Sequence, residues 1–397
     1  MRVLWFASIP GLLNNNNAYN GAGWIGALQY AMMEYYGDEI TLGIAYPSGT
    51  LETVEENGVT YYSLHRIRHT FFQYSKKEKK SGEEMKGIIN DFRPDIIMCF
   101  GSEEFFGIVC TLTNIPVVIH LQGILNPLYE AWLPKGLSLR KYLSKLSNLI
   151  PWIALRQNIA REKRIFAKCQ HFIGRTDWDN AIVKLMAPQA TYHYGGELMR
   201  PIIYESNKTW KLTPRSKKRI VSIISSNVYK GGDVVLRTAS LLREFTNIEF
   251  SWDVYGVNNF CEWERLTGIN ARDVSVQICG IITAEQLIDV VCNADLFVHP
   301  SYIENSPNTV CEAQILGIPV IATNTGGTGS IVEDGVTGVL VPVNAPHPLA
   351  SKIIELLDNK DLALRLGSAA RQIALERHRP EKIVKELMET YNRILEK

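Results

Sequence analysis

The chain has 397 residues, and its 42 basic and 41 acidic residues give a formal net charge of +1 with histidine neutral. Hydrophobic residues make up 46% and charged residues 21% of it, which excludes a mostly disordered or fibrous chain. The length exceeds what one compact core accommodates and predicts two domains of roughly 200 residues each. A charge so near zero removes the simplest case for a nucleic-acid binder.

The seven cysteines are odd in number and widely spaced, and several lie in apolar runs such as Ile96–Phe100. This pattern favours reduced, buried thiols of a cytoplasmic protein over a disulfide framework, and no CxxC or CxxH cluster indicates zinc. The segment Met1–Pro10 is too short for a signal peptide, and no apolar run reaches the roughly 18 residues of a membrane span.

In the first half, short apolar runs alternate with longer amphipathic stretches, a pattern typical of parallel strands covered by helices. The strands that it predicts are Arg2–Ser8, Ile40–Tyr46, Val59–Leu64, Asp95–Gly101, Pro116–His120 and His171–Gly174. The helices that it predicts are Ala22–Tyr36, Glu83–Phe92, Glu103–Leu112 and Asp177–Met186. The polar stretch Tyr204–Arg219 then indicates a linker.

The alternation restarts after this stretch. The strands predicted there are Arg219–Ser225, Ile248–Tyr255, Val274–Cys279, Asp295–His299 and Pro319–Ala322. The helices are Gly231–Phe245, Ala284–Cys292, Asn308–Leu316, Pro346–Leu357, Asp361–Arg377 and Pro380–Glu396. We therefore expect an α/β fold of two doubly wound, Rossmann-like domains, with ligands at the carboxyl ends of strands, facing a cleft between the domains. The expected bounds are 1–203, a linker at 204–218, 219–378, and a C-terminal helix at 379–397.

The most informative segment is 299–313, where a hydrophobic strand ends in a polar loop and a proline precedes a helix. The backbone N–H groups of Asn308 and Thr309 would lie at the start of that helix, a position that attracts phosphate. Glu304 lies in the loop and Glu312 on the helix, so one carboxylate can meet a sugar hydroxyl and the other a ribose diol. A capped helix with two solvated glutamates is the structural alternative.

Glu304 and Glu312, with seven residues between them and Gly317–Thr323 after them, resemble the signature of retaining glycosyltransferase family 4. The continuation from Gly326-Gly327 to Val341-Pro342 is similar to that family too. The resemblance implies the GT-B fold, two Rossmann-like domains with a cleft between them. It also implies a nucleotide-sugar donor held mainly by the C-terminal domain, without a metal ion or another cofactor.

The resemblance extends to Tyr229–Asp233, which follows the first strand of the second half as the family's Lys-Gly does. This places Lys230 against the donor diphosphate, where a point charge suits phosphate; a surface lysine at a helix start is the alternative. Shortly before this lysine the family usually has an arginine, where this chain has Ser225. One phosphate charge is then less compensated, or another cation such as Arg175 supplies it. The loop ending at Ile282 resembles the one that contacts the nucleobase edge.

In the first half, Gly21–Gly26 spells GxGxxG, the pattern of a dinucleotide site. That interpretation needs the motif directly after the first strand and an acid at the end of the second, and the sequence has neither. The family resemblance implies instead a glycine-rich loop and helix start, with Gly21 and Gly23 near the donor phosphate or the acceptor.

His120 ends a predicted strand, where the family places a histidine that contacts the donor sugar. His171, His193 and His299 are interpreted as structural, with His299 able to orient the Glu304 loop. The segment Asp177–Asp179 mimics the metal-binding DxD of another glycosyltransferase fold, but acids also suit a first helical turn, and we expect no metal there.

The residues assigned to the site thus form two sets. The catalytic set is Glu304, His120 and Lys230. The donor-binding set is Glu312, Ser225, Ser306, Asn308, Thr309, Gly21, Gly23, Ile282 and Arg175.

Two basic stretches carry interleaved aromatic and aliphatic residues. The basic residues of the first, within 131–170, are Lys135, Arg140, Lys141, Lys145, Arg156, Arg161, Lys163, Arg164 and Lys168. Those of the second are Arg66, Arg68, Lys76, Lys77, Lys79 and Lys80. Such stretches suit an anionic membrane surface, and a solvated helical face is the alternative.

We therefore predict a cytoplasmic, retaining hexosyltransferase-type glycosyltransferase, peripheral on the inner face of the plasma membrane. It would move a sugar from a nucleoside diphosphate sugar, with UDP as the expected nucleotide, to a saccharide or lipid-linked acceptor of surface polysaccharide synthesis. No nucleic acid is expected as a partner. A same-fold sugar-nucleotide epimerase and a catalytically degenerate nucleotide-sugar-binding protein stay open, the latter because of Ser225. A dehydrogenase ranks last.

Overall fold

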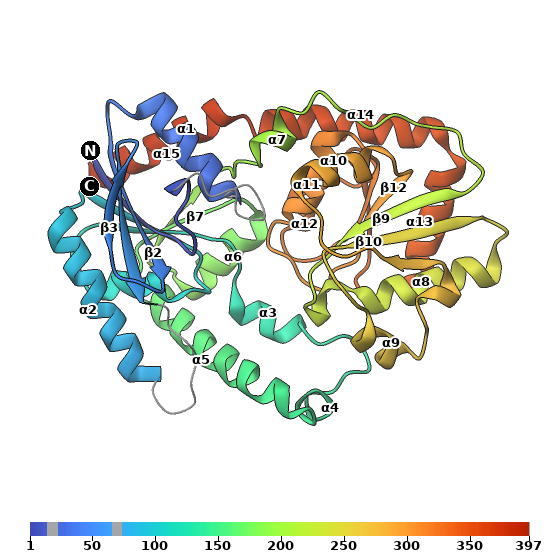
Figure 1. Ribbon diagram of the computed structural model, residues 1–397, viewed down its shortest axis with the longest axis horizontal. Coiled ribbons are helices and arrows are strands. Elements are labelled where there is room, and N and C mark those ends of the chain that lie inside the picture. Colours follow the sequence, from blue (N-terminus) through green and yellow to red (C-terminus); the bar gives the residue numbers. More distant parts are fainter. Residues whose placement is uncertain (14–22, 66–73, 397) are drawn as a thin grey trace. The chain divides into compact units, whose positions relative to one another are not determined.

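The computed structural model describes residues 1–13, 23–65 and 74–396. For residues 74–77 it describes the backbone but not the side chains. Contacts divide the chain into two units. The first contains Met1–Pro127, Arg140–Leu198 and His378–Lys397, and the second contains Leu128–Leu139 and Met199–Arg377. Each unit is built on one sheet, so the two are described separately (Figure 1).

The sheet of the first unit has eight strands in the order β3-β4-β2-β1-β5-β6-β7-β8, and every pair is parallel except β3–β4. Its strands are β1 (Arg2–Phe6), β2 (Thr41–Ser48), β3 (Thr53–Glu56), β4 (Val59–His65), β5 (Ile96–Phe100), β6 (Val117–His120), β7 (His171–Gly174) and β8 (Thr191–Tyr194). Between and after them come α1 (Gly23–Tyr36), α2 (Tyr74–Phe92), η2 (Phe105–Thr111), α3 (Leu125–Ala131), α4 (Leu139–Leu143), η3 (Leu146–Asn148), α5 (Leu149–Phe166), α6 (Asp177–Met186) and, at the end of the chain, α15 (Pro380–Leu395).

Both faces of this sheet are buried, as a parallel sheet requires. In β1, Val3 and Trp5 belong to the core shared with α1 and α15, whereas Leu4 and Phe6 belong to the core shared with α2, η2 and α5. This alternation follows from the two-residue period of a strand. The helices α1 and α15 lie side by side over one face (Figure 1).

The sheet of the second unit has six parallel strands in the order β11-β10-β9-β12-β13-β14. They are β9 (Lys218–Ile223), β10 (Phe250–Tyr255), β11 (Val276–Ile278), β12 (Leu296–His299), β13 (Val320–Thr323) and β14 (Val339–Val341). The helices are α7 (Pro201–Tyr204), η4 (Val228–Lys230), α8 (Gly232–Phe245), α9 (Cys261–Thr267), η5 (Arg272–Val274), α10 (Ala284–Cys292), α11 (Asn308–Leu316), α12 (Thr328–Ile331), α13 (Pro346–Asp358) and α14 (Lys360–Arg377).

This strand order is the one of the Rossmann fold, and it reverses direction between β9 and β12. In such sheets ligands bind at the carboxyl ends of the strands that flank the reversal. Here Ile220 of β9 packs with α8 and α13 on one face, while Val221 packs with α10 and α11 on the other. The predicted fold class, two Rossmann-like parallel α/β domains, is therefore confirmed.

Several details differ from the sequence expectations. The pattern missed β3, β8 and β14, which are edge strands or short ones, and η2 replaces the α-helix expected over Glu103–Leu112. The residues expected as a linker, 204–218, belong to the second unit. There Trp210 is buried, and its Nε1 donates to the carbonyl of Ala294 at 2.8 Å. Residues 128–139 also group with the second unit. Trp132 and Leu137 in this segment are buried although basic residues surround them in the sequence.

Helix α15 is tied to the first sheet by a buried polar contact. Tyr391 is fully buried, and its hydroxyl accepts from Trp5 Nε1 at 3.1 Å and donates to Met98 Sδ at 3.2 Å. Both indole and phenol therefore have a partner in an otherwise apolar core.

This contact makes Tyr391→Phe a test of how strongly α15 is held. The variant would leave the buried indole N–H of Trp5 without its acceptor, and we expect the free energy of unfolding to fall by about 1–3 kcal/mol. Chemical denaturation measures this directly. Tyr35→Phe is the matched control, because Tyr35 is 46% exposed and should change stability by under ~0.5 kcal/mol. Equal stabilities for the two variants would show that the hydrogen bond between Trp5 and Tyr391 does not stabilise the fold.

Candidate functional site

Three loops meet at the carboxyl ends of β9, β12 and β13 in the second unit. They are residues 224–231, 300–307 and 324–327. The first two follow the strands that flank the reversal of strand order. This is the place where an open α/β sheet leaves a crevice for a ligand.

The loops approach so closely that glycine is required at two points. Gly231 has φ +80°, and a Cβ there would lie 2.1 Å from the carbonyl oxygen of Pro300. Gly326 has φ +52°, and a Cβ there would lie 1.7 Å from the carbonyl oxygen of Glu304. Hydrogen bonds join the same loops, from Tyr302 N to Tyr229 O at 2.8 Å and from Gly327 N to Glu304 O at 3.1 Å. The loop that carries Glu304 is thus clamped from both sides.

Lys230, Glu304 and His299 form a cluster at this junction. Lys230 Nζ lies 2.6 Å and His299 Nε2 lies 3.0 Å from Glu304 Oε1. Burial by itself raises the pKa of the Glu304 carboxyl, but the Lys230 ammonium and the His299 ring outweigh it and hold that pKa well below its usual range. Burial likewise lowers the pKa of Lys230, and Glu304 overcomes this to raise it. At neutral pH the cluster therefore holds a carboxylate beside an ammonium.

A second hydrogen-bond network connects the Glu304 loop to the start of α8. The Tyr302 hydroxyl donates to Asp233 Oδ2 at 2.7 Å and lies 3.0 Å from Asn344 Oδ1. Arg237 pairs with Asp233 and donates to Asn344 Oδ1 at 2.9 Å. Asp233 is completely buried in the first turn of α8, directly after Lys230-Gly231-Gly232. The loop and the lysine are consequently positioned by the same helix start.

Glu312 lies on α11, one turn after the helix begins at Asn308. The amides of Asn308 and Thr309 belong to the first turn of α11, where the helix dipole favours negative charge. Glu312 is buried, and its two oxygens accept from Nε and Nη2 of Arg200 at 2.7 and 2.8 Å. Burial raises the pKa of the Glu312 carboxyl, and Arg200 opposes that rise. No motif of the sequence indicates Arg200, which lies 112 residues from its partner.

The other residues predicted to bind the donor in this unit lie in loops. Ser225 is exposed after β9, where its hydroxyl accepts from Asn227 Nδ2 at 3.2 Å. Ser306 precedes α11 and is half-buried. Ile282 is half-buried between β11 and α10, packed against the core that α10 and α11 share. The structure thus brings Lys230 and Glu304 into direct contact and places Ser225, Ser306, Asn308, Thr309, Glu312 and Ile282 in the same unit.

His120, Arg175 and Gly23 belong to the first unit, and Gly21 lies outside the described residues. His120 ends β6, stacks on Trp24 with ring centroids 5.3 Å apart, and has Gln122 Nε2 2.6 Å from its Nδ1. Burial, with Arg175 adding to it, lowers the pKa of His120 to about 3, so the ring is neutral near pH 7. It lines a cavity of about 10 Å³, the space of one water molecule.

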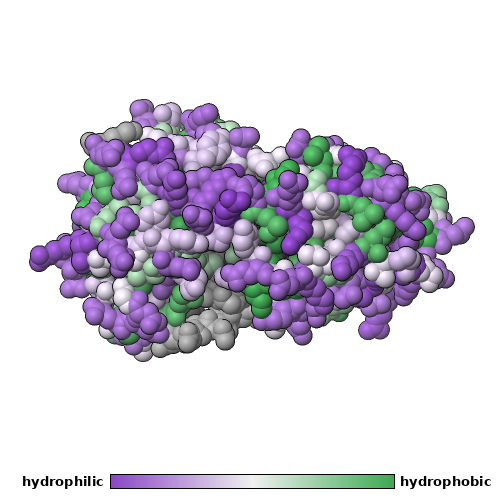
Figure 2. All heavy atoms as spheres, turned by 90° about the horizontal axis from the view of Figure 1, so that it is seen from above, coloured by the Kyte–Doolittle hydropathy of each residue, from purple (hydrophilic) through white to green (hydrophobic). Residues whose placement is uncertain are grey.

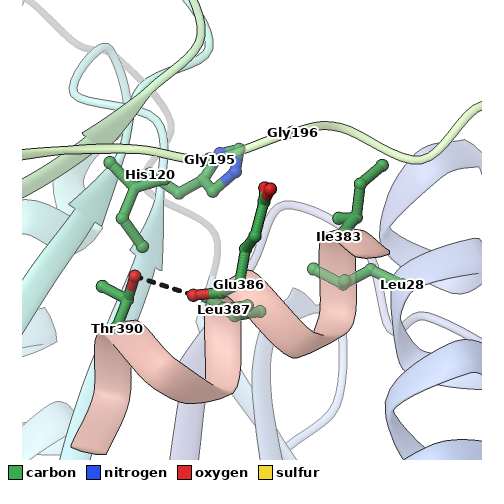
Figure 3. Close-up of a pocket in the computed structure, with 9 residues that line it drawn as sticks. Leu28, His120, Gly195, Gly196, Ile383, Glu386, Leu387 and Thr390 are labelled. Carbon is green, nitrogen blue, oxygen red and sulfur yellow. Dashed lines mark hydrogen bonds between the residues drawn. The ribbon is translucent and has the colours of Figure 1, made fainter. Parts of the chain in front are cut away.

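Figure 3 shows the His120 ring against the Gly195–Gly196 segment, with Glu386 of α15 extending toward the same segment. Arg175 forms a buried ion pair with Glu197, which follows that segment. The charge of Arg175 is therefore already matched within the first unit. Gly23 opens α1 with φ +59°.

The segment Asp177–Asp179 starts α6, as the sequence predicts. Asp179 completes a capping box with Thr176, and Asp177 accepts from Tyr194. His171 and His193 lie on neighbouring strands with ring nitrogens 3.3 Å apart. Over the described ranges, no group of three or more His, Cys, Asp or Glu side chains is placed to hold a metal ion.

The second basic stretch lies mostly outside the described residues, because residues 66–73 and the side chains of Lys76 and Lys77 are not among them.

Within the part of the chain that the structure does describe, no helix is long and apolar enough to cross a membrane. Hydrophilic side chains dominate the face in Figure 2, with hydrophobic ones in small groups among them.

Comparisons with known proteins find similarity to glycosyltransferases over the second unit. Residues 205–373 match the family model described as glycosyl transferases group 1. An uncharacterised glycosyltransferase of Methanocaldococcus jannaschii is 29% identical over 141 residues, which are 34% of this chain and 38% of that protein. A D-inositol 3-phosphate glycosyltransferase of Corynebacterium diphtheriae is 32% identical over 151 residues, which are 36% of this chain and 35% of that protein. The chain thus spans little more than a third of the curated relatives it matches.

Solved structures are similar over nearly the whole chain. Sucrose-phosphate synthase from Thermosynechococcus elongatus has a TM-score of 0.75 at 15% identity, covering 99% of this chain and 98% of that one. Anabaena HepE in complex with UDP and glucose has a TM-score of 0.65 at 14% identity, covering 99% of both chains. WaaG has a TM-score of 0.66 at 13% identity, covering 98% of this chain and 99% of that one. The fold is GT-B, and residues 205–373 are similar to the glycosyl transferases group 1 family.

The close contacts that hold the Glu304 loop can be tested by substituting two glycines that both have a positive φ. Gly326→Ala adds a Cβ that meets the Glu304 carbonyl, whereas Gly335→Ala, at φ +72°, adds one with no atom within 4 Å. Both variants pay the left-handed strain of about 1–2 kcal/mol. We expect Gly326→Ala to lose about 1–3 kcal/mol more, because the loop must move. Thermal and chemical denaturation compare the two, and a loss no greater at 326 than at 335 would show that the loops are not clamped.

Proposed function

We propose that the protein is a retaining, hexosyltransferase-type glycosyltransferase that moves a sugar from a UDP-sugar to an acceptor hydroxyl. The observation that carries this is the Lys230–Glu304 pair at the carboxyl ends of β9 and β12, next to the start of α11. It combines a cation for a diphosphate, a carboxylate for sugar hydroxyls and helix amides for phosphate oxygens. The retaining stereochemistry is proposed on the resemblance of the Glu304–Glu312 segment to glycosyltransferase family 4.

The leaving diphosphate is the group on which charge develops during transfer. We assign its stabilisation to Lys230 and to the amides of Asn308 and Thr309, with the Ser306 hydroxyl beside them. An ammonium has three N–H donors, and within the described residues its hydrogen bond goes to Glu304, so the other N–H groups can donate to phosphate oxygens. In this proposal these groups act without a metal ion or cofactor.

The two glutamates have separate roles in the proposal. Glu304 accepts from hydroxyls of the donor sugar, since its low pKa keeps it ionised, and Glu312 accepts from the ribose diol. Ser225 adds a hydroxyl beside the phosphates, and Ile282 contacts the nucleobase edge. UDP is proposed as the nucleotide because HepE, a neighbour in fold, is described in complex with UDP.

In the first unit, we propose His120 as a hydrogen-bonding contact to the donor sugar. Its low pKa makes it a neutral partner and a poor base near pH 7. Gly21 and Gly23 are proposed to bring backbone amides toward the substrates. Because Arg175 is paired with Glu197, we assign it a weaker, longer-range effect on the donor charge.

The acceptor is proposed to be a lipid-linked saccharide or a growing surface polysaccharide. One structural neighbour, WaaG, is described as involved in lipopolysaccharide biosynthesis. Residues 140–150 add a basic, apolar surface, because Leu146 is 85% and Ile150 61% exposed near Arg140, Lys141 and Lys145. We propose that this surface holds the protein on an anionic, cytoplasmic membrane face.

Activity with UDP-sugars tests the site assignment. Lys230→Ala and Glu312→Ala should each lower kcat/KM by about 10–100-fold, the effect of removing a charged hydrogen bond. Lys352→Ala is the matched control, because Lys352 is exposed and pairs only with Glu355 on α13. The measurement is product mass with donor plus acceptor and with donor alone, in the presence and absence of EDTA.

Full activity in both site variants would overturn the assignment. A product formed from donor alone with the sugar isomerised would indicate an epimerase. Binding of nucleotides without any product would indicate a degenerate site, and loss of transfer in EDTA would contradict the metal-independent step.

Membrane association has its own test. Replacing Leu146 and Ile150 together with Gln should weaken binding to vesicles containing phosphatidylglycerol by about tenfold or more, since each apolar side chain buried contributes roughly 1.5–3 kcal/mol. Leu185→Gln is the control, because Leu185 is 80% exposed on α6. Co-sedimentation measures the bound fraction, which should also fall with salt and on phosphatidylcholine alone. Wild-type protein that does not sediment with anionic vesicles would contradict the proposal.

A further inference from the structure

Arg200, the buried partner of Glu312, has no role in the function proposed so far. Both oxygens of Glu312 accept from one guanidinium, through Nε at 2.7 Å and Nη2 at 2.8 Å. The exposed fractions of the two side chains are only 12% and 6%. A bidentate pair with this geometry fixes the plane of the carboxylate as well as its position.

We propose that Arg200 is the positioning residue for nucleotide binding, and that it presents Glu312 as an oriented, ionised carboxylate to the ribose hydroxyls. The inference rests on the proposed function. A carboxylate has about four lone-pair directions, and Arg200 occupies two of them, one on each oxygen. The remaining two are held in a fixed plane and can accept from a diol.

Arg200 is the charge that sets the ionisation of Glu312. The elements packed against α11 include α7, α10, α14 and β13, and α12 accepts a hydrogen bond from Gln314. Their charged groups near it include Glu285 of α10 and Arg371 and Arg377 of α14. Arg371 and Arg377 donate to the Ile315 carbonyl and to Gln314 Oε1, and Glu285 is exposed. Burial raises the pKa of Glu312, and among these charges Arg200 is the one that opposes it.

The location of Arg200 in the chain gives the pair a further property. Arg200 precedes α7, directly after Leu198 ends a segment of the first unit and Met199 begins the second. The carboxylate proposed to bind the nucleotide is therefore oriented by a residue next to one of the places where the backbone passes between the units.

The experiment measures the affinity for UDP and for 2′-deoxy-UDP by calorimetry from pH 5.5 to 9. In Arg200→Gln we expect UDP affinity to fall about tenfold or more near pH 7, as one charged contact is lost. Without Arg200 the pKa of Glu312 rises further, so the variant should recover affinity as pH increases, with a midpoint above that of the wild type. The preference for UDP over 2′-deoxy-UDP should shrink, and Arg200→Lys should restore part of it.

The controls separate positioning from folding. Arg265→Gln breaks an exposed Arg–Glu pair on α9 and should match the wild type throughout. The double variant Arg200→Gln with Glu312→Gln removes both charges, so it avoids an unpaired buried carboxylate and should bind UDP no worse than Glu312→Gln alone.

The outcomes distinguish this inference from the proposed function. Wild-type protein that binds no UDP would overturn both. Wild-type binding with an Arg200→Gln variant of equal affinity, or one whose loss is the same at every pH and for both nucleotides, would overturn the positioning role alone. The expected shift in the pH profile, with partial rescue by lysine, would support it.

Discussion

The close approach of three backbone loops at the carboxyl ends of β9, β12 and β13 is the constraint on which the site depends. The carbonyls of Pro300 and Glu304 occupy the space that a side chain would need at 231 and 326, so both positions are held by glycine. The same approach brings Lys230 and Glu304, 74 residues apart in the chain, within 2.6 Å. A cation and a carboxylate are thus preorganised by backbone geometry before any ligand arrives, which reduces the ordering that binding requires.

Every buried charge near these loops has an oppositely charged or hydrogen-bonding partner. Lys230 is paired with Glu304, Arg200 with Glu312, and Arg237 with Asp233. Unpaired, such groups would be expensive to bury and would neutralise instead. A diphosphate bound at Lys230, as proposed, would share the ammonium with Glu304 through the N–H groups that Glu304 does not use. His299 lies 3.0 Å from the same Glu304 oxygen and gives the carboxylate a second partner.

The sequence predicts the fold well because both sheets depend on local periodicity. Short apolar runs followed by amphipathic stretches locate most strands, and the motifs around Glu304 and Lys230 single out two loops that the structure brings into contact. It does not find Arg200, whose role comes from a partner 112 residues away, or the contact of Tyr302 with Asp233 across 69 residues. The segment around Trp210 was expected to be a linker because its neighbours are polar. In the structure it belongs to the second unit, where the buried indole donates to the Ala294 carbonyl.

The two glutamates of the motif show how environment separates similar residues. Both carboxyls are buried, and burial alone would raise the pKa of each. Glu304 has two cationic or hydrogen-bonding partners, Lys230 and His299, and its pKa is depressed, whereas Glu312 has Arg200 alone and its pKa is raised. Two partners on one oxygen therefore hold Glu304 in its ionised form. For Glu312, the Arg200 guanidinium opposes the effect of burial, so the ionisation of the proposed ribose-binding group depends on a residue 112 positions earlier in the chain.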